Sequence, residues 1–73
     1  MRKLYHVEAL WDLDAKVWTS SSDLPGLVIE TSTLAEFEAL MRELAPEVLA
    51  DNGHDTAVLI EWHAKGAFEV QTA

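Results

Sequence analysis

The chain of 73 residues contains no cysteine, few basic residues and no long apolar run. Without cysteine it can form no disulfide to stabilise a small fold. No apolar segment approaches the ~20 residues that a membrane-spanning helix needs, and the N-terminal segment lacks the apolar stretch of a signal peptide. A cytoplasmic location is therefore expected. Because repeats, low-complexity stretches and an interdomain linker are also missing, we expect residues 1–73 to form a single domain.

Positive charge is scarce. Lys and Arg together number 5 against 13 Asp and Glu, which gives a formal net charge of −8. Such a field repels phosphate backbones and attracts basic surfaces. Direct binding of nucleic acid is therefore not expected, and a small basic protein is the kind of partner that the charge favours.

Apolar residues, by contrast, are abundant: 49% of the chain is hydrophobic, and three residues are Trp. This composition predicts a hydrophobic core rather than disorder. A chain this short buries roughly 60% of the surface that its unfolded form exposes, and that burial barely offsets the lost chain entropy. We therefore expect self-association, with a dimer favoured, to supplement the small core.

Four segments are predicted to be strands. Residues 3–11 and 56–64 alternate apolar with polar side chains, and residues 17–19 and 27–29 are short β-prone runs between turn residues. The sequence at residues 64–67 permits a tight turn with Gly66 at positive φ, and Phe68 and Val70 then mark an optional short fifth strand.

One helix is predicted between the third and fourth strands. Thr33 to Glu36 reads as a capping box, which marks the helix start. The residues expected on its buried face are Leu34, Phe37, Leu40, Met41, Leu44 and Val48, and those on its outer face are Glu36, Glu43 and Glu47. Pro46 should kink or restart the helix near Ala45, and Asn52 with Gly53 should end it.

The resulting order, β-β-β-α-β(-β), predicts an α+β fold. Two hairpins leave the third strand parallel to the first, and a right-handed crossover through the helix brings in the fourth strand parallel to the first as well. The prediction is one helix on one face of a mixed sheet of order 3-2-1-4, with the fifth strand beside the fourth. The opposite face and the two edges are left for solvent or for a partner.

The stretch from Trp11 to Leu40 resembles the N-terminal domain of HicB antitoxins, and more narrowly a family of short uncharacterised HicB-like proteins. The features that carry the resemblance are the turn after Trp11, the segment D-L-P-G at residues 23–26, and Thr33, Leu34 and Glu36 at the helix start. Features that resemble the helix end of the short proteins are Leu44, Pro46, Glu47, Leu49, Asn52 and Gly53.

The resemblance implies a partial ribonuclease-H-like fold that binds and masks a small basic toxin, itself an mRNA-cleaving protein. The sequence lacks the C-terminal helix-turn-helix or ribbon-helix-helix domain with which many HicB antitoxins bind operator DNA, so autorepression by this chain alone is not expected. The alternative hypotheses are a stand-alone homo-oligomer with a regulatory or scaffolding role and a small metal-dependent enzyme.

The predicted partner-binding surface is acidic with one aromatic anchor. It consists of Asp12 and Asp14 in the first turn, Glu36, Glu43 and Glu47 on the helix, and Trp18. Large aromatics dominate binding hot spots. Trp11 and Trp62 share the phase of their strands' apolar residues and are expected in the core. The phase of Trp18 does not assign it to either face of the sheet, and it is the candidate for an exposed aromatic among the three tryptophans.

The sequence also offers candidates for metal binding and catalysis. If the first and fourth strands pair in parallel, His6 and Glu8 stand beside Glu61 and His63, a set of residues able to bind a divalent metal. Ordinary solvated positions are the favoured interpretation, so no metal or cofactor is expected, and His54 is expected to be an exposed loop residue. The carboxylates do not converge from strand ends as two-metal catalysis requires, and residues 20–22, all serine, lack a nucleophile elbow. We therefore expect no enzyme activity.

Overall fold

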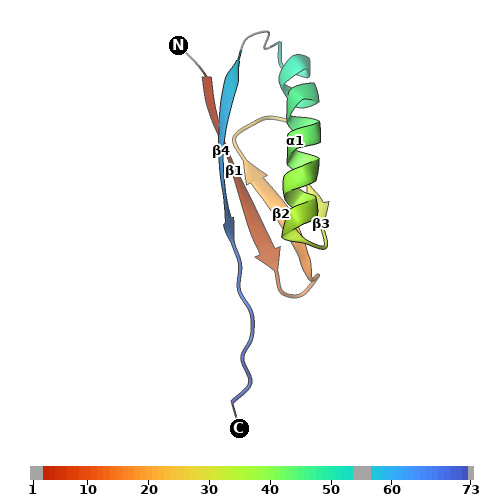
Figure 1. Cartoon of the computed structure of the whole chain (residues 1–73), viewed down its shortest axis with the longest axis vertical. Helices are drawn as coiled ribbons and strands as arrows, with labels where there is room; N and C mark the ends of the chain where they lie inside the picture. The colour runs from red at the N-terminus through yellow and green to blue at the C-terminus, as the bar shows by residue number, and fades with distance from the viewer. Residues whose placement is uncertain (1–2, 54–56, 73) are drawn as a thin grey trace.

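The structure is a computed structural model that describes residues 3–53 and 57–72. Figure 1 shows one long helix lying along a sheet, with the C-terminal segment running away from the body. The elements are β1 (Lys3–Asp12), β2 (Val17–Ser22), β3 (Glu30–Thr31), α1 (Leu34–Asp51) and β4 (Val58–Lys65). The predicted order β-β-β-α-β is confirmed. The predicted fifth strand is wrong, because residues 66–72 carry no regular secondary structure.

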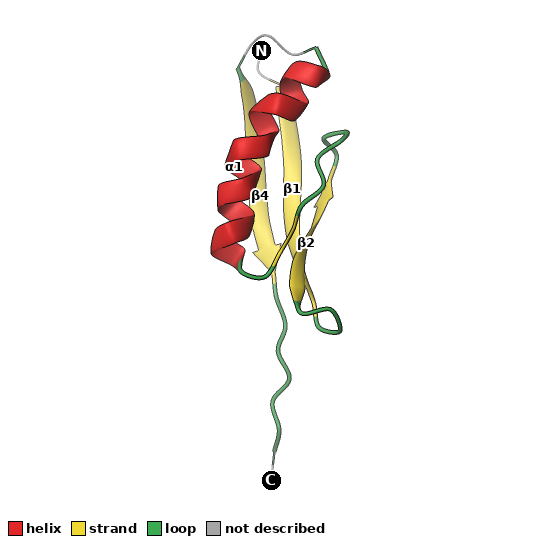
Figure 2. Ribbon diagram, turned by 90° about the vertical axis from the view of Figure 1, so that its right-hand side faces the viewer, coloured by secondary structure: helices red, strands yellow, loops and turns green. Residues whose placement is uncertain are grey.

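The sheet has the predicted order, β3-β2-β1-β4. β1 pairs antiparallel with β2 and parallel with β4, and β2 pairs antiparallel with β3. In the register, Val7 lies opposite Ser22 on one side and Trp62 on the other. Because Val7 is fully buried and side chains alternate along a strand, odd-numbered residues of β1 face α1, which covers this side of the sheet (Figure 2).

The core lies between α1 and the sheet. Its buried members are Val7, Ala9, Leu24, Leu27, Ile29, Phe37 and Met41. Leu34, Leu40, Leu44 and Val48 pack against it, whereas Glu36, Glu43 and Glu47 are exposed. The predicted division of the helix into a buried and an acidic face is therefore confirmed.

The third strand was predicted at residues 27–29, but β3 has only two residues and begins later, at Glu30. Leu27 and Ile29 are buried in the core while Val28 is 79% exposed, so this segment alternates like a strand. However, its contact with β2 is partly made by a side chain: Ile29 N–H donates to Ser20 Oγ at 2.8 Å, and Ser20 N–H donates to Ile29 O at 3.1 Å. The regular ladder begins only at Glu30.

The helix begins and ends where the sequence predicts. Thr33 is the N-cap, and its hydroxyl accepts from Glu36 N–H at 3.1 Å and donates to Glu36 Oε1 at 2.8 Å. Asn52 is the C-cap, and Gly53 follows with φ +82°. Of the two expected effects of Pro46, a restart near Ala45 does not occur: α1 continues through Pro46 as the single helix that was predicted. The carbonyl that loses its donor there belongs to Arg42, an exposed residue.

The expected tight turn at Gly66 is also wrong. Among the described residues, the glycines with positive φ are Gly26 and Gly53. A Cβ at Gly66 would lie 3.0 Å from Cη2 of Trp18. Gly66 therefore lets the Trp18 ring approach the backbone, and the chain continues past Lys65 instead of reversing.

Candidate functional site

The sheet face away from α1 carries two pairs of side chains, each made of a histidine and a carboxylate. The register places His6 beside Glu61 and Glu8 beside His63, so the predicted proximity of these four residues is confirmed. His63 Nε2 lies 2.5 Å from Glu8 Oε2, and His6 Nε2 lies 3.8 Å from Glu61 Oε2. Within residues 3–53 and 57–72, no three such side chains converge as metal binding requires. The arrangement is two histidine–carboxylate pairs.

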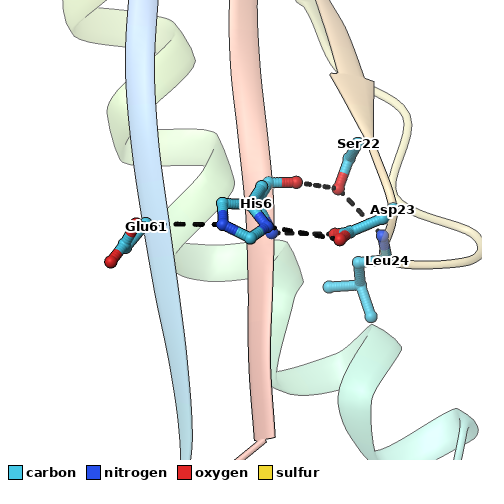
Figure 3. A network of polar contacts seen from close by, with 5 residues as sticks. All are labelled: His6, Ser22, Asp23, Leu24 and Glu61. Carbon is cyan, nitrogen blue, oxygen red and sulfur yellow. Dashed lines mark hydrogen bonds and ion pairs between the residues drawn. The ribbon is translucent and has the colours of Figure 1, made fainter.

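Asp23 joins His6 in a polar network that the sequence did not reveal (Figure 3). His6 N–H donates to Asp23 Oδ1 at 2.7 Å, and the His6 ring Nδ1 lies 3.4 Å from Asp23 Oδ2. Ser22 Oγ donates to His6 O at 2.8 Å and accepts from Leu24 N–H at 3.0 Å. The Asp23 carboxylate thus accepts a hydrogen bond from the backbone N–H of His6, the β1 residue just beyond the last pair of the β1–β2 ladder. The chain leaves the sheet at this point, and Leu24 enters the core.

The same contacts shift the ionisation of Asp23. The hydrogen bond from the His6 backbone N–H lowers the pKa of this carboxyl below its ordinary 3.8. Partial desolvation opposes this effect, and the His6 ring adds to the lowering by hydrogen bonding and by its charge. Asp23 therefore favours the folded state in its ionised form.

This lowered pKa predicts a specific pH dependence. A carboxyl with a depressed folded pKa contributes stability above its unfolded value, 3.8, and loses it as the pH falls through the lower folded pKa. Asp23→Asn should therefore flatten the fall of stability with acidification over this window. Urea midpoints measured from neutral pH to below 3.8 test this, with Asp14→Asn as the control. Superimposable profiles for Asp23→Asn and wild type would contradict the role of this carboxylate.

A shallow hollow of about 250 Å³ lies beside these residues, on the open face. Its polar lining residues are His6, Glu8, Ser21, Ser22, Asp23 and His63. The Ser22 hydroxyl donates a hydrogen bond to the His6 carbonyl, and the Ser20 hydroxyl accepts one from Ile29 N–H. The serine run thus serves the sheet itself, as expected for a polar strand end.

The predicted acidic residues of α1 share one surface. Spacings of seven and four residues place Glu36, Glu43 and Glu47 in one stripe along the helix, and all three are exposed. The helix has a single basic residue, Arg42, and Arg42 Nη2 lies 2.8 Å from Glu38 Oε2. Negative charge along this stripe is therefore not neutralised by the helix itself.

Two other predicted acidic residues lie in the β1–β2 turn. Asp12 Oδ1 accepts from Asp14 N–H at 3.0 Å and from Ala15 N–H at 3.1 Å, so the Asp12 side chain stabilises the turn. The turn lies at the same end of the molecule as the start of α1 (Figure 1). Asp14 is exposed.

Trp18 is not an exposed anchor. The register places it opposite Trp11 on the helix-facing side, where their ring centroids are 5.3 Å apart and Trp18 packs against the core. Trp18 and Trp11 are both half-buried. Trp62 is partly buried against the core, as expected. The prediction for His54 lies outside the described residues.

These features define a small α+β domain with an acidic helix and an open sheet face. Residues 4–70 match the family described as a domain of unknown function, DUF1902, and the chain belongs to this family. Its structure is similar to the crystal structure of the hypothetical protein TTHA1013 from the extremely thermophilic bacterium Thermus thermophilus. The two share 34% identity over 96% of this chain and 100% of that one, with a TM-score of 0.71.

No curated protein matches the chain. Among the described residues, no helix is long and apolar enough to cross a membrane.

Proposed function

We propose that this domain is an antitoxin-like protein-binding module that masks a small basic protein, as the HicB resemblance implies. The observation that carries the proposal is the exposed stripe of Glu36, Glu43 and Glu47. It belongs to a chain with a net charge of −8. A surface of this kind is complementary to a basic partner and repels nucleic acid.

Masking follows from competition for the same basic surface. A protein that cleaves mRNA must approach a polyanion, and Lys and Arg side chains supply most of that attraction. An acidic helix that covers those side chains excludes the RNA backbone. This mechanism requires no catalytic group in the domain, which is consistent with the proposal of a non-enzymatic role.

The acidic stripe also borders a surface for apolar contact. A shallow hollow beside it is lined by Thr31, Glu36, Ala39, Leu40 and Glu43. Complementary charge speeds encounter, whereas packing in such a hollow sets the lifetime of a complex. The two contributions can be separated by mutation.

Reversal of the stripe should impair binding to a basic partner. We expect Glu43→Lys with Glu47→Lys to slow association and to flatten its salt dependence, because long-range attraction is lost. The probe is the product of the neighbouring reading frame, which the proposal predicts to be a short basic protein. It is purified separately, and association is followed by stopped-flow fluorescence at several salt concentrations.

The matched control is Glu30→Lys with Glu69→Lys, which changes the net charge equally at exposed positions away from the stripe. It should retain most of the association rate. The proposal is wrong if the wild-type domain does not bind the neighbouring basic protein, or if the reversed variant binds it as fast as the wild type.

A stand-alone homo-oligomer is the second candidate, and one observation favours it. β4 is a long strand at the edge of the sheet, and such edges pair readily with another chain. The two candidates differ in whether association requires a second kind of protein.

A further inference from the structure

The outer edge of β4 is open in the described part of the chain. β4 spans eight residues and has β1 as its neighbour on one side, with no strand on the other. β3, the strand at the opposite edge, has only two residues. Natural edge strands are usually shortened, bulged or interrupted by proline, and β4 contains no proline. Its outward N–H and C=O groups can therefore accept another strand.

A groove of about 360 Å³, most of whose lining residues are apolar, runs beside this edge, between α1 and β4. Its lining residues are Met41, Arg42, Ala45, Pro46, Leu49, Val58, Ile60 and Trp62. The three residues from β4 are the ones that face the helix. A strand added at this edge would place alternate side chains into the groove.

The segment 66–72 has the pattern of such a strand. Phe68 is 83% exposed and Val70 is 67% exposed, and they alternate with Glu69 and Gln71. Figures 1 and 2 both show this tail leaving the body at the end of β4 and running away from it. The radius of gyration is 14.3 Å, whereas a compact chain of this length has about 11 Å. Two apolar side chains are thus presented to solvent on an extended arm.

We propose that two copies of the chain exchange these tails. Each tail would pair antiparallel with β4 of the other copy around a two-fold axis at Ala64. In this register, helix-facing residues lie opposite one another: Val70 opposite Val58, Phe68 opposite Ile60, and Gly66 opposite Trp62. Both apolar tail residues enter the partner's groove.

The other face of the new pairing is also compatible. Glu61 lies opposite Ala67, and His63 lies opposite Lys65, so no two carboxylates oppose each other directly. Leu59, which is 41% exposed, gains Glu69 as its neighbour.

The lengths match as well. At about 3.4 Å per residue, the seven-residue tail and the eight-residue strand have nearly equal extents. Because the axis is two-fold, every contact is made twice. The two sheets become one continuous sheet, and both open edges of β4 are removed.

Substitution in the tail tests the exchange. Sedimentation equilibrium of the wild-type chain at micromolar concentration should show a dimer. Phe68→Asp should raise the dimer dissociation constant by about 100-fold or more, because both copies lose a buried phenyl ring. The side chain is exposed in a single copy, so circular dichroism should show an unchanged fold. The control, Gln71→Asp, adds the same charge to the same tail and should leave the dimer intact.

The register has its own test. The chain has no cysteine, so Ala64→Cys introduces a single thiol, placed at the proposed axis. Directly opposed Cα atoms of antiparallel strands lie about 4.5–5.5 Å apart, which suits a disulfide. Ala64→Cys should therefore cross-link two copies on mild oxidation, and Gln71→Cys should not.

A monomeric wild-type chain overturns the proposal, as does a dimer that Phe68→Asp leaves unchanged or a dimer that Ala64→Cys fails to cross-link. The test uses this chain alone, so its outcome is independent of whether a basic partner exists.

Discussion

Phe37→Ala is expected to lower the free energy of unfolding by about 3–5 kcal/mol. Phe37 is fully buried and lies on the sheet-facing side of α1, in a cluster with Val7, Ala9 and Ile29. Removal of the ring takes away its burial and leaves a cavity that the surrounding side chains fill only in part. The free energy of unfolding of a protein domain is about 5–15 kcal/mol in total. This change therefore removes a large share of the stability.

Urea unfolding followed by circular dichroism measures the effect, with an unchanged slope indicating an unchanged extent of unfolding. Glu43→Ala, on the outer face of the same helix, is the control and should change stability by less than about 0.5 kcal/mol. Comparable losses at the two positions would mean that the assignment of the helix faces is wrong.

The helix was predictable from sequence because its determinants are local. Thr33 and Glu36 contact each other within one turn, and the faces follow from the 3.6-residue period. The order of the strands was predictable because hairpins and a right-handed crossover leave few arrangements. The same reasoning placed His6 beside Glu61 and Glu8 beside His63.

The face of Trp18 was not predictable, since it depends on the register between β1 and β2. That register is set in the turn, where Lys16 has φ 57° and its N–H donates to Asp12 O at 2.7 Å. A left-handed residue other than glycine has little signal in the sequence. The acidic face of α1, in contrast, could be predicted from the 3.6-residue period of a helix alone.

The contact between His6 and Asp23 was missed for a similar reason. It joins residues 17 positions apart, at the point where a strand leaves the sheet. Asn52 shows the same limit: its Nδ2 donates to Pro25 O at 3.0 Å across 27 positions. Turn residues were predicted ahead of the third strand, at D-L-P-G, and a helix end was predicted at N-G. Local patterns did not reveal that these two segments meet.

Leu24→Ala, within the D-L-P-G segment, is expected to cost about 2–5 kcal/mol. Turn chemistry alone predicts a surface position for this residue, yet Leu24 is only 2% exposed and belongs to the core. Three local features fix the backbone around Leu24. Leu24 N–H donates to Ser22 Oγ, Gly26 reverses the chain with φ +90°, and Pro25 O accepts from Asn52.

These constraints leave the backbone little freedom to move into the space that a shortened side chain vacates, so the cost should lie well above that of a surface loop. Val28→Ala is the matched control from the same segment, because Val28 is 79% exposed and should tolerate the change within about 0.5 kcal/mol. Chemical denaturation of both variants decides the question. A loss at Leu24 no larger than that at Val28 would show that residues 23–29 form a surface loop rather than part of the core.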